Sequence, residues 1–251
     1  MKFKAKLPDE SVNVSEKNPL KELGVLLLGM TGVFLSLYLI LGFFVDSAIA
    51  ALPLEVEQRW SKSLEFELGD GAIESHPRLD SIMKYLQESS GDTTPVEIHL
   101  LKEKGFNAFA APGLKIYVLQ DLVDSVQSDE ELAFVLAHEL GHFQGRHHLR
   151  GLGRSVVLTI VSLFFFGQNS EVVSFFTPAI GSLQNHYSRE QEREADEFGA
   201  QMLYNAYGSL DGGIDFFKRL QKLDNTPEFL KWMSTHPGHE ERLDFLKTWT
   251  P

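Results

Sequence analysis

Two histidines one helical turn apart enclose a glutamate in the stretch F-V-L-A-H-E-L-G-H-F at 134–143. On a helix, His138 and His142 share a face, so that both imidazoles can bind one zinc ion. Glu139 lies next to His138, where it can reach a water molecule on that ion and accept its proton. The alternative is a chance pattern of surface histidines on an amphipathic helix. The apolar flanks favour the metal, because unpaired polar side chains are costly among apolar neighbours.

A catalytic zinc site needs a third protein ligand and an open position for water. The favoured third ligand is a carboxylate, because glutamate and aspartate bind zinc at catalytic sites as histidine does. The candidate stretch is S-R-E-Q-E-R-E-A-D at 188–196. Glu192 could bind the metal, while Asp196, one turn later on the same face, could accept the second ring N–H of a ligand histidine. The alternative is a solvated helix face with charge pairs.

A helix and a neighbouring sheet are predicted to position these residues. Ser128 and Glu131 form the capping-box pattern of a helix start, which predicts that 134–143 is helical. Alternating apolar residues around a Pro112-Gly113 turn predict a small sheet with a hairpin. The predicted strands are 96–100, 107–110 and 116–119, and 55–90 is predicted to be largely helical, with Leu79, Ile82, Met83 and Leu86 on one face.

A long apolar segment near the start of the chain predicts a transmembrane helix. The 22 residues at 24–45 carry no charge, and roughly 20 helical residues cross a hydrocarbon core of about 30 Å. A cleaved signal peptide is the competing interpretation, because Ala48-Ile49-Ala50 resembles a cleavage site. The apolar run is too long and begins too late for that interpretation.

The charges around this segment predict its orientation. On its C-terminal side, the only basic residues within about twenty positions are Arg59 and Lys62. The basic residues that precede it are Lys2, Lys4, Lys6, Lys17 and Lys21. By the positive-inside rule, we expect 1–23 in the cytoplasm, a single membrane crossing at 24–45, and the domain at 46–251 outside the cytoplasm.

Two further apolar runs, 155–166 and 172–183, lie between the two ligand-bearing segments. They cannot cross a membrane an odd number of times, because His142 and Glu192 would then lie on opposite sides. At about 12 residues, or roughly 18 Å of helix, each run is too short to span. We expect a hydrophobic insertion at 152–183 that forms an interfacial hairpin or a buried core helix, and its many phenylalanines favour membrane contact.

Composition limits the remaining possibilities. With 251 residues, 43% of them hydrophobic, the chain can bury one core of catalytic size plus an appendage. The formal net charge of -12 argues against a nucleic-acid partner. Because the sequence has no cysteine, disulfides, thiolate metal sites and cysteine nucleophiles are excluded. Any metal must therefore be bound by histidine and carboxylate.

Four motifs together resemble the membrane zinc metallopeptidases typified by HtpX and the CAAX prenyl proteases, the minigluzincins. They are N-A-F-A-A-P-G at 107–113, H-E-L-G-H at 138–142, S-R-x-x-E-x-E-A-D at 188–196, and T-H-P at 235–237 followed by Arg242. The resemblance implies an α+β fold: a mainly helical, zincin-like domain with a small β-sheet, preceded here by the transmembrane helix. Leu114 departs from the family, which often has a second glycine there, and several relatives cross the membrane repeatedly.

The resemblance also implies roles for the residues of the two central motifs. His138, His142 and Glu192 would bind one zinc ion per chain. Glu139 would be the general base of the reaction.

Two outer motifs have implied roles as well. Asn107, Ala108, Phe109 and Ala110 would form an edge strand to which a substrate peptide adds. His236 is by local sequence a turn or capping residue before proline, but the resemblance implies that it lies close to the metal. There it could stabilise the oxyanion or, as a zinc ligand, hold the enzyme latent. We expect the oxyanion role, because a loop histidine can reach the site without competing for zinc.

These observations predict a membrane-anchored zinc endopeptidase whose partners are polypeptide substrates and membrane lipid. By family analogy, it would act in quality control of misfolded membrane or envelope proteins, and a bacterial inner membrane is the expected location. The alternative is a membrane-tethered peptide-binding or chaperone-like module with a structural zinc. A structural site has four closed ligands and no need of Glu139, which favours the enzyme. A prenyl-protein processing protease is disfavoured by the small number of spanning segments.

Overall fold

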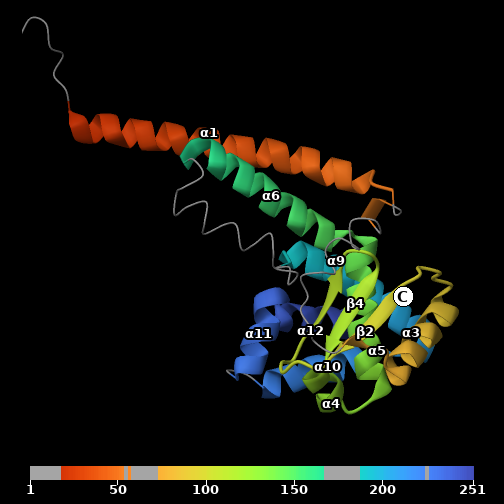
Figure 1. The fold of residues 1–251 in the computed structure, drawn as a ribbon. Coiled ribbons are helices and arrows are strands. Elements are labelled where there is room, and N and C mark those ends of the chain that lie inside the picture. Colours follow the sequence, from red (N-terminus) through yellow and green to blue (C-terminus); the bar gives the residue numbers. More distant parts are fainter. Residues whose placement is uncertain (1–17, 54–55, 58–72, 167–186, 224–225) are drawn as a thin grey trace, which may run out of the picture.

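The computed structural model describes residues 18–53, 56–57, 73–166, 187–223 and 226–251 (Figure 1). Its helices and strands are, in chain order, α1 (Pro19–Ala50), β1 (Ile73–Glu74), α3 (Pro77–Ser90), β2 (Glu97–Leu101), β3 (Ala108–Ala111), β4 (Lys115–Leu119), α4 (Gln120–Ser125), α5 (Asp129–Gln144), α6 (His147–Phe166), α9 (Arg189–Tyr207), α10 (Asp211–Lys222), α11 (Pro227–Thr235) and α12 (His239–Thr248). The predicted α+β fold, mainly helical with a small sheet, is confirmed. The apolar run at 172–183 lies outside the described residues.

The four strands form one sheet in the order β1-β2-β4-β3. β2 and β4 run parallel, whereas β3 and β4 form the predicted antiparallel hairpin, in which Ala108 lies opposite Val118. β3 is therefore an edge strand of the described sheet. The sequence does not predict β1, because a strand of two residues is too short to show an alternating pattern.

The turn between β3 and β4 explains one departure from the family pattern. Gly113 has φ 89° and Leu114 has φ 64°, so that two consecutive residues adopt left-handed backbone. Glycine adopts this region freely, whereas a residue with a side chain loses roughly 1–2 kcal/mol there. The Leu114 side chain is buried in the core, and burial of a leucine contributes about 1.5–3 kcal/mol. Burial therefore offsets backbone strain that a glycine would avoid.

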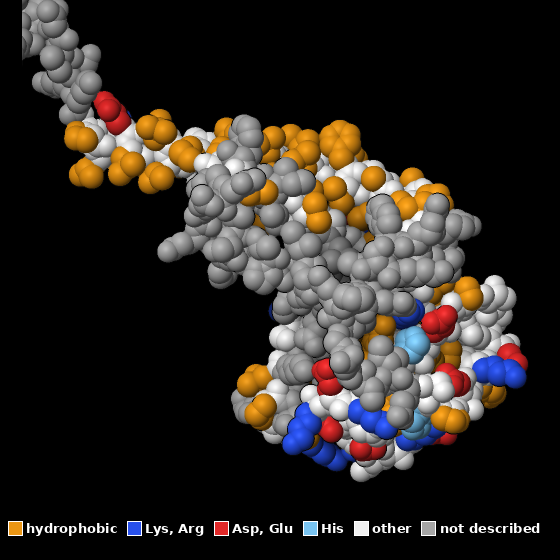
Figure 2. All heavy atoms as spheres, in the orientation of Figure 1, with side chains coloured by type: hydrophobic (Ala, Val, Ile, Leu, Met, Phe, Trp, Pro, Cys, Tyr) orange, Lys and Arg blue, Asp and Glu red, His pale blue; other side chains and the backbone are white. Residues whose placement is uncertain are grey.

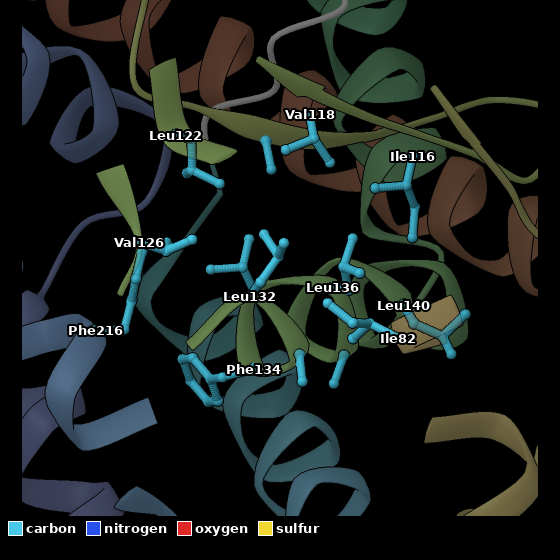
Figure 3. Close-up of a cluster of buried hydrophobic side chains, with 14 of the residues drawn as sticks. Ile82, Ile116, Val118, Leu122, Val126, Leu132, Phe134, Leu136, Leu140 and Phe216 are labelled. Carbon is cyan, nitrogen blue, oxygen red and sulfur yellow. The ribbon is translucent and has the colours of Figure 1, made fainter. Parts of the chain in front are cut away.

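α5 is the central helix of the globular part, and its residues are buried from Glu131 to Phe143. Leu132, Leu136 and Leu140 recur on one face of the helix, where they meet Ile116 and other apolar residues of the sheet (Figure 3). The face that covers the sheet is thus separate from the side that contacts α9.

Two glycines allow α5 and α9 to approach closely. A Cβ atom at Gly141 would lie 2.9 Å from the backbone of Ala195. A Cβ atom at Gly199 would lie 3.2 Å from the backbone nitrogen of His138. This close contact carries the acidic residues of α9 onto the histidines of α5.

The start of α5 follows the predicted capping pattern in part. The Ser128 side chain accepts a hydrogen bond from the Glu131 N–H at 3.1 Å. The carboxylate of Glu131 binds Arg219 of α10 with two contacts of 2.7 and 2.8 Å. Glu131 therefore joins two helices, a role that the local pattern cannot predict.

α1 and α6 form an arm on one side of the globular part (Figure 1). Among the described residues, α1 is the one helix long and apolar enough to cross a membrane. It extends beyond the predicted 24–45, because Asn18 caps it, Pro19 fits its first turn, and helical structure continues to Ala50. Figure 2 shows hydrophobic side chains along α1, whereas charged side chains gather on the globular part.

α6 packs along α1 in the opposite direction. Gly153 lies against Ile49 near the base of the arm, and the rings of Phe34 and Phe165 are 5.8 Å apart farther along it. The helix has 20 residues, which is longer than the apolar run at 155–166 because the preceding turns are helical too. This run therefore packs against α1 and lies outside the core around α5.

Candidate metal centre

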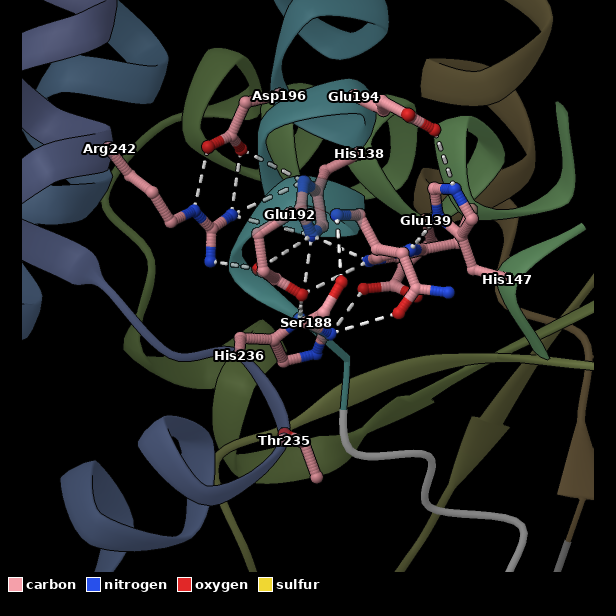
Figure 4. A network of polar contacts seen from close by, with 12 residues as sticks. His138, Glu139, His147, Ser188, Glu192, Glu194, Asp196, Thr235, His236 and Arg242 are labelled. Carbon is pink, nitrogen blue, oxygen red and sulfur yellow. Dashed lines mark hydrogen bonds and ion pairs between the residues drawn. The ribbon is translucent and has the colours of Figure 1, made fainter. Parts of the chain in front are cut away.

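Three histidines and a glutamate from separate parts of the chain converge on one buried point (Figure 4). His138 and His142 project from α5, Glu192 projects from α9, and His236 follows α11. All four side chains are at most 1% exposed. One potential ligand atom from each lies within 4.8 Å of the others. The structure thus brings the three sequence-predicted ligands together and adds His236 as a fourth donor.

The spacing of these donor atoms fits a zinc ion. His138 Nε2 lies 3.1 Å from His142 Nε2 and 3.4 Å from His236 Nδ1. Glu192 Oε1 lies 3.2 Å from His236 Nδ1 and 3.5 Å from His142 Nε2. Ligands of a tetrahedral zinc ion are about 3.3 Å apart, given bonds of about 2.0–2.1 Å. Both the donor types and their separations therefore suit zinc.

Neutral imidazoles and an ionised carboxylate are the protonation states that bind a metal. Burial lowers the pKa of His142 well below its usual value, although Glu192 acts in the other direction. Burial opposes ionisation of Glu192, but the charge of Arg242 and the contacts with His236 and His142 together outweigh it and hold the pKa of Glu192 well below its usual value. His236 differs, because the carboxylates of Glu192 and Glu139 outweigh its burial and raise its pKa.

Asp196 contacts His138 on the side of the ring that faces away from the cluster. Its Oδ1 atom lies 3.0 Å from His138 Nδ1, so that the carboxylate can accept this N–H while Nε2 faces the cluster. Arg242 of α12 donates to both carboxylate oxygens of Asp196 at 2.7 Å and lies 2.5 Å from Glu192. Asp196 is thus placed where the motif predicts it. The motif contains Arg242 but does not predict that it joins both carboxylates.

His142 is contacted by residues that the sequence motifs do not predict. His142 Nδ1 lies 2.9 Å from His147 Nδ1, and His147 Nε2 lies 3.0 Å from Glu194 Oε2 (Figure 4). The ring of Tyr187 stacks on His142 with ring centroids 3.6 Å apart. Because His147 lies beyond the end of α5, no helical spacing links it to His142 in the sequence.

Glu139 is fully buried beside the cluster and is not one of its four donors. Neither carboxylate oxygen has a hydrogen-bond partner among the residues that the structure describes. Burial raises the pKa of Glu139, although His236 and His138 act in the other direction. His236 Nε2 lies 3.7 Å from one carboxylate oxygen, and a buried carboxyl without a closer hydrogen-bond partner is costly. Its position therefore suits a group that exchanges a proton with a bound molecule.

The edge strand β3 runs past Glu139 and His236. Asn107, just before the strand, accepts a hydrogen bond from β4 through its carbonyl. Because residues of an antiparallel strand alternate in direction, the main-chain groups of Ala108 and Ala110 point to the free edge. The Ala108 carbonyl lies 3.4 Å from His236 Nε2. The free edge of β3 thus faces the cluster.

The side chains of two other predicted substrate-binding residues are also buried. Phe109 stacks on Tyr117 with centroids 5.3 Å apart, in a small apolar cluster separate from the main core. The side-chain amide of Asn107 is buried, and neither its nitrogen nor its oxygen has a partner within the described part of the chain. Asn107 therefore offers an unused donor and acceptor close to the edge strand.

Comparison with known proteins extends this description. The mitochondrial metalloendopeptidase OMA1 of Schizosaccharomyces pombe is 28% identical over 216 residues, which are 80% of this chain and 63% of the relative. OMA1 of Homo sapiens is 26% identical over 61% of this chain and 32% of the relative. The metalloprotease YcaL of Escherichia coli is 28% identical over 68% of both proteins. This chain thus spans between 32 and 63% of the length of these two OMA1 proteins.

The family comparison covers the sheet from Glu74 onward and every residue of the cluster. Residues 74–250 match the model of Peptidase family M48. This range includes both histidines of α5, the acidic residues of α9 and the loop that carries His236. The chain therefore belongs to peptidase family M48.

Proposed function

We propose that this chain is a membrane-anchored zinc metalloendopeptidase. The observation that carries the proposal is the position of Glu139, a buried carboxyl without a hydrogen-bond partner in the described residues, beside a four-donor cluster. A structural zinc site would have no need of a free carboxyl at this position. The names of the relatives, metalloendopeptidase and metalloprotease, support the same reaction class.

His138, His142 and Glu192 would hold the zinc ion. When bound, zinc polarises the scissile carbonyl and makes a water molecule more acidic. Glu139 accepts a proton from the attacking water, and its raised pKa makes the carboxylate a stronger base for this step. The same carboxyl then donates the proton to the leaving amine. Its burial keeps bulk water away from the proton during the transfer.

A substrate peptide would add to β3 as an extra strand. β3 has β4 on one side in the described sheet, and the main-chain groups of Ala108 and Ala110 point to the other side. Asn107 supplies an unpaired amide at the start of this edge. Such binding uses the main chain of the substrate, which supports polypeptides as the substrate class.

The position of His236 supports a latent role over the oxyanion role expected from the sequence. Its Nδ1 atom lies 3.4 Å from His138 Nε2 and 3.2 Å from Glu192 Oε1. These are the separations expected between ligands of one zinc ion, about 3.3 Å. A catalytic zinc site keeps one position open. His236 would therefore have to leave the cluster before substrate and water can enter.

The arm would place the metal centre close to a membrane. Phe34 lies near the middle of the uncharged run 24–45, and its ring contacts Phe165 near the end of α6. Asp46, the first charge after that run, pairs at 2.6 Å with Arg154, the last charge of α6. From Arg154 to Phe165, α6 rises about 16 Å, or roughly half of a hydrocarbon core of about 30 Å. α6 would therefore enter the bilayer to about its midplane.

This placement defines the expected substrates and orientation. His147 precedes Arg154 by seven residues, or about 10 Å of helix. The metal centre would thus act on peptide segments near a membrane surface, as in quality control of membrane or envelope proteins.

The lysines before α1 favour a globular part outside the cytoplasm. A reporter fused after Pro251 tests this orientation, and a cytoplasmic signal would contradict it.

Metal analysis combined with casein cleavage tests the proposed activity. In detergent micelles, the full chain should contain one zinc ion and cleave casein. Glu139→Gln should retain zinc and lose about 10² to 10⁴-fold in kcat, as expected when a general base is removed. Glu190→Gln is a matched control, because this exposed carboxylate pairs with Arg193 at the surface. Unchanged cleavage by Glu139→Gln would refute the assigned base, and wild-type protein without zinc would refute the metalloenzyme.

A further inference from the structure

We infer that His147 and Glu194 position the second metal ligand, His142, through a hydrogen-bonded relay that fixes its tautomer. The inference rests on the proposed function, because it requires His142 to bind a metal ion. His147 is fully buried at the start of α6, and Glu194 lies on the α9 surface with a side chain 47% exposed. Neither residue is among the four donors.

The contacting nitrogen atoms determine where each proton of the relay lies. A metal ligand at His142 Nε2 leaves the proton of that ring on Nδ1. This N–H is donated to His147 Nδ1, 2.9 Å away, which must then be the unprotonated nitrogen of its ring. His147 consequently carries its proton on Nε2 and donates it to Glu194 Oε2 at 3.0 Å. One arrangement of protons therefore satisfies both contacts and leaves His142 Nε2 with a lone pair toward the cluster.

The two histidines of α5 are thus positioned differently. His138 contacts a carboxylate directly, because Asp196 lies 3.0 Å from its Nδ1 atom and is itself bound by Arg242. The carboxylate that serves His142 is separated from it by the His147 ring and is half exposed to water. Since water screens an exposed charge, we expect the relay to contribute less to metal affinity than Asp196 does.

The backbone beside the His147 ring leaves room for it, because residue 145 is a glycine. Gly145 ends α5, and a Cβ atom at this position would collide with the imidazole of His147. Gly145 has φ -75°, so that its backbone conformation does not require glycine. The ring is fully buried and held at both nitrogens, and it cannot move aside without breaking one of these contacts. Glycine at 145 is therefore needed for the position of His147.

Zinc affinity measured by chelator competition on the full chain in micelles tests the relay independently of proteolysis. His147→Leu and Glu194→Ala should weaken zinc binding by about 10 to 100-fold, the usual effect of losing a partner behind a ligand. Glu190→Ala, on the same helix but paired with Arg193 at the surface, should bind zinc as wild type does. His147→Gln should recover most of the affinity, because its amide can accept from His142 and donate to Glu194.

Cobalt substitution adds a readout of ligand geometry. The visible absorption of the Co²⁺ protein should change in His147→Leu and return toward wild type in His147→Gln. Wild-type affinity and spectra in both His147→Leu and Glu194→Ala would overturn the inference. If His147→Leu does not fold, Glu194→Ala decides the outcome, and wild-type zinc affinity and spectra in that variant would overturn the inference. A wild-type protein that binds no zinc would overturn the proposed function itself, which distinguishes the two failures.

Discussion

The metal centre and the α1–α6 arm place side chains in opposite environments. In the centre, ionisable residues such as Glu139 and Asp196 are fully buried. In the arm, large apolar residues are exposed, with Leu28 at 79% and Phe43 at 69%. Burial of charge and exposure of hydrocarbon are both unfavourable in water. The composition of each region therefore suits a partner other than water, a metal cation for the centre and lipid for the arm.

The two regions meet at the junction of α5 and α6. Arg146, between these helices, donates to the carbonyls of Ile49 and Leu52 at the end of α1, at 2.8 and 2.5 Å. The next residue, His147, contacts His142 of the centre. Adjacent residues thus connect the arm and the centre, so that the position of one region constrains the other.

The largest predicted effect comes from replacing Arg242, which carries a positive charge inside the metal centre. Arg242→Leu would leave Glu192 and Asp196 without their cation, and breaking such a buried ion contact costs about 3–5 kcal/mol. We expect a loss of this size in the free energy of unfolding without metal, and a smaller loss with zinc, because zinc supplies positive charge to Glu192. Denaturant unfolding with and without a chelator measures both values. Arg242→Lys should fall between, and equal losses under both conditions would contradict the prediction.

His236 tests whether the centre is closed in its resting state. As a zinc ligand, His236 blocks the open position, and we expect His236→Ala to raise basal casein cleavage. As an oxyanion donor, its loss would instead lower kcat by about 100-fold or more with little change in KM. Steady-state kinetics with parallel zinc analysis distinguish the two roles. His239→Ala serves as a control in the same segment, and wild-type activity in both variants would leave His236 a structural role.

The arm can be tested by the environment of single residues, because the natural sequence has no cysteine. A nitroxide attached to Leu163→Cys on α6 should be more accessible to oxygen than to a water-soluble nickel complex, since oxygen concentrates in lipid. A nitroxide at Leu35→Cys on α1, where the native side chain is 53% exposed, should show the same preference for oxygen. Tyr85→Cys on the globular surface should show the reverse preference. Nickel accessibility at Leu163→Cys equal to that at Tyr85→Cys would place α6 outside the bilayer.

The sequence predicts the part of the centre that lies within single helices. His138 and His142 are four residues apart, as are Glu192 and Asp196, so that helical periodicity alone places each pair on one face. The hairpin of β3 and β4 is also predicted, because the turn residues and the alternating strands are adjacent in sequence. Local spacing is thus sufficient wherever the interacting residues belong to one element or to two consecutive ones.

The remaining contacts depend on how separate segments pack, which spacing does not encode. The local sequence predicts that Glu194 is an exposed charge on a helix surface. Only the packing of α9 against α5 brings it to His147. The end of α1 shows the same limitation. An apolar window ends before Asp46, but the helix continues to Ala50, and Asp46 pairs with Arg154 of α6. Sequence periodicity cannot predict this distant partner.

The smallest predicted effect concerns the attachment of the arm to the sheet. Glu57 lies 2.9 Å from His148 of α6 and accepts a hydrogen bond from the Gly113 N–H of the β3–β4 turn at 3.3 Å. Burial would raise the pKa of Glu57, but the contact with His148 and the Gly113 hydrogen bond outweigh it and lower the pKa below the usual 4.5. A group whose pKa is lowered by folding stabilises the protein above its unfolded pKa, and this contribution is lost as pH falls through the folded pKa.

The free energy of unfolding should therefore fall as pH drops below about 4.5, and Glu57→Gln should reduce the size of this fall, because it removes one titrating group. Denaturant unfolding at a series of pH values measures the difference between the two slopes. Glu88→Gln, whose carboxylate is 65% exposed beside Lys84, is the matched control and should retain the wild-type slope. Identical slopes in wild type and Glu57→Gln would mean that this contact does not stabilise the folded state. A reduced slope with unchanged zinc affinity would show that the attachment of the arm and the metal centre contribute separately to stability.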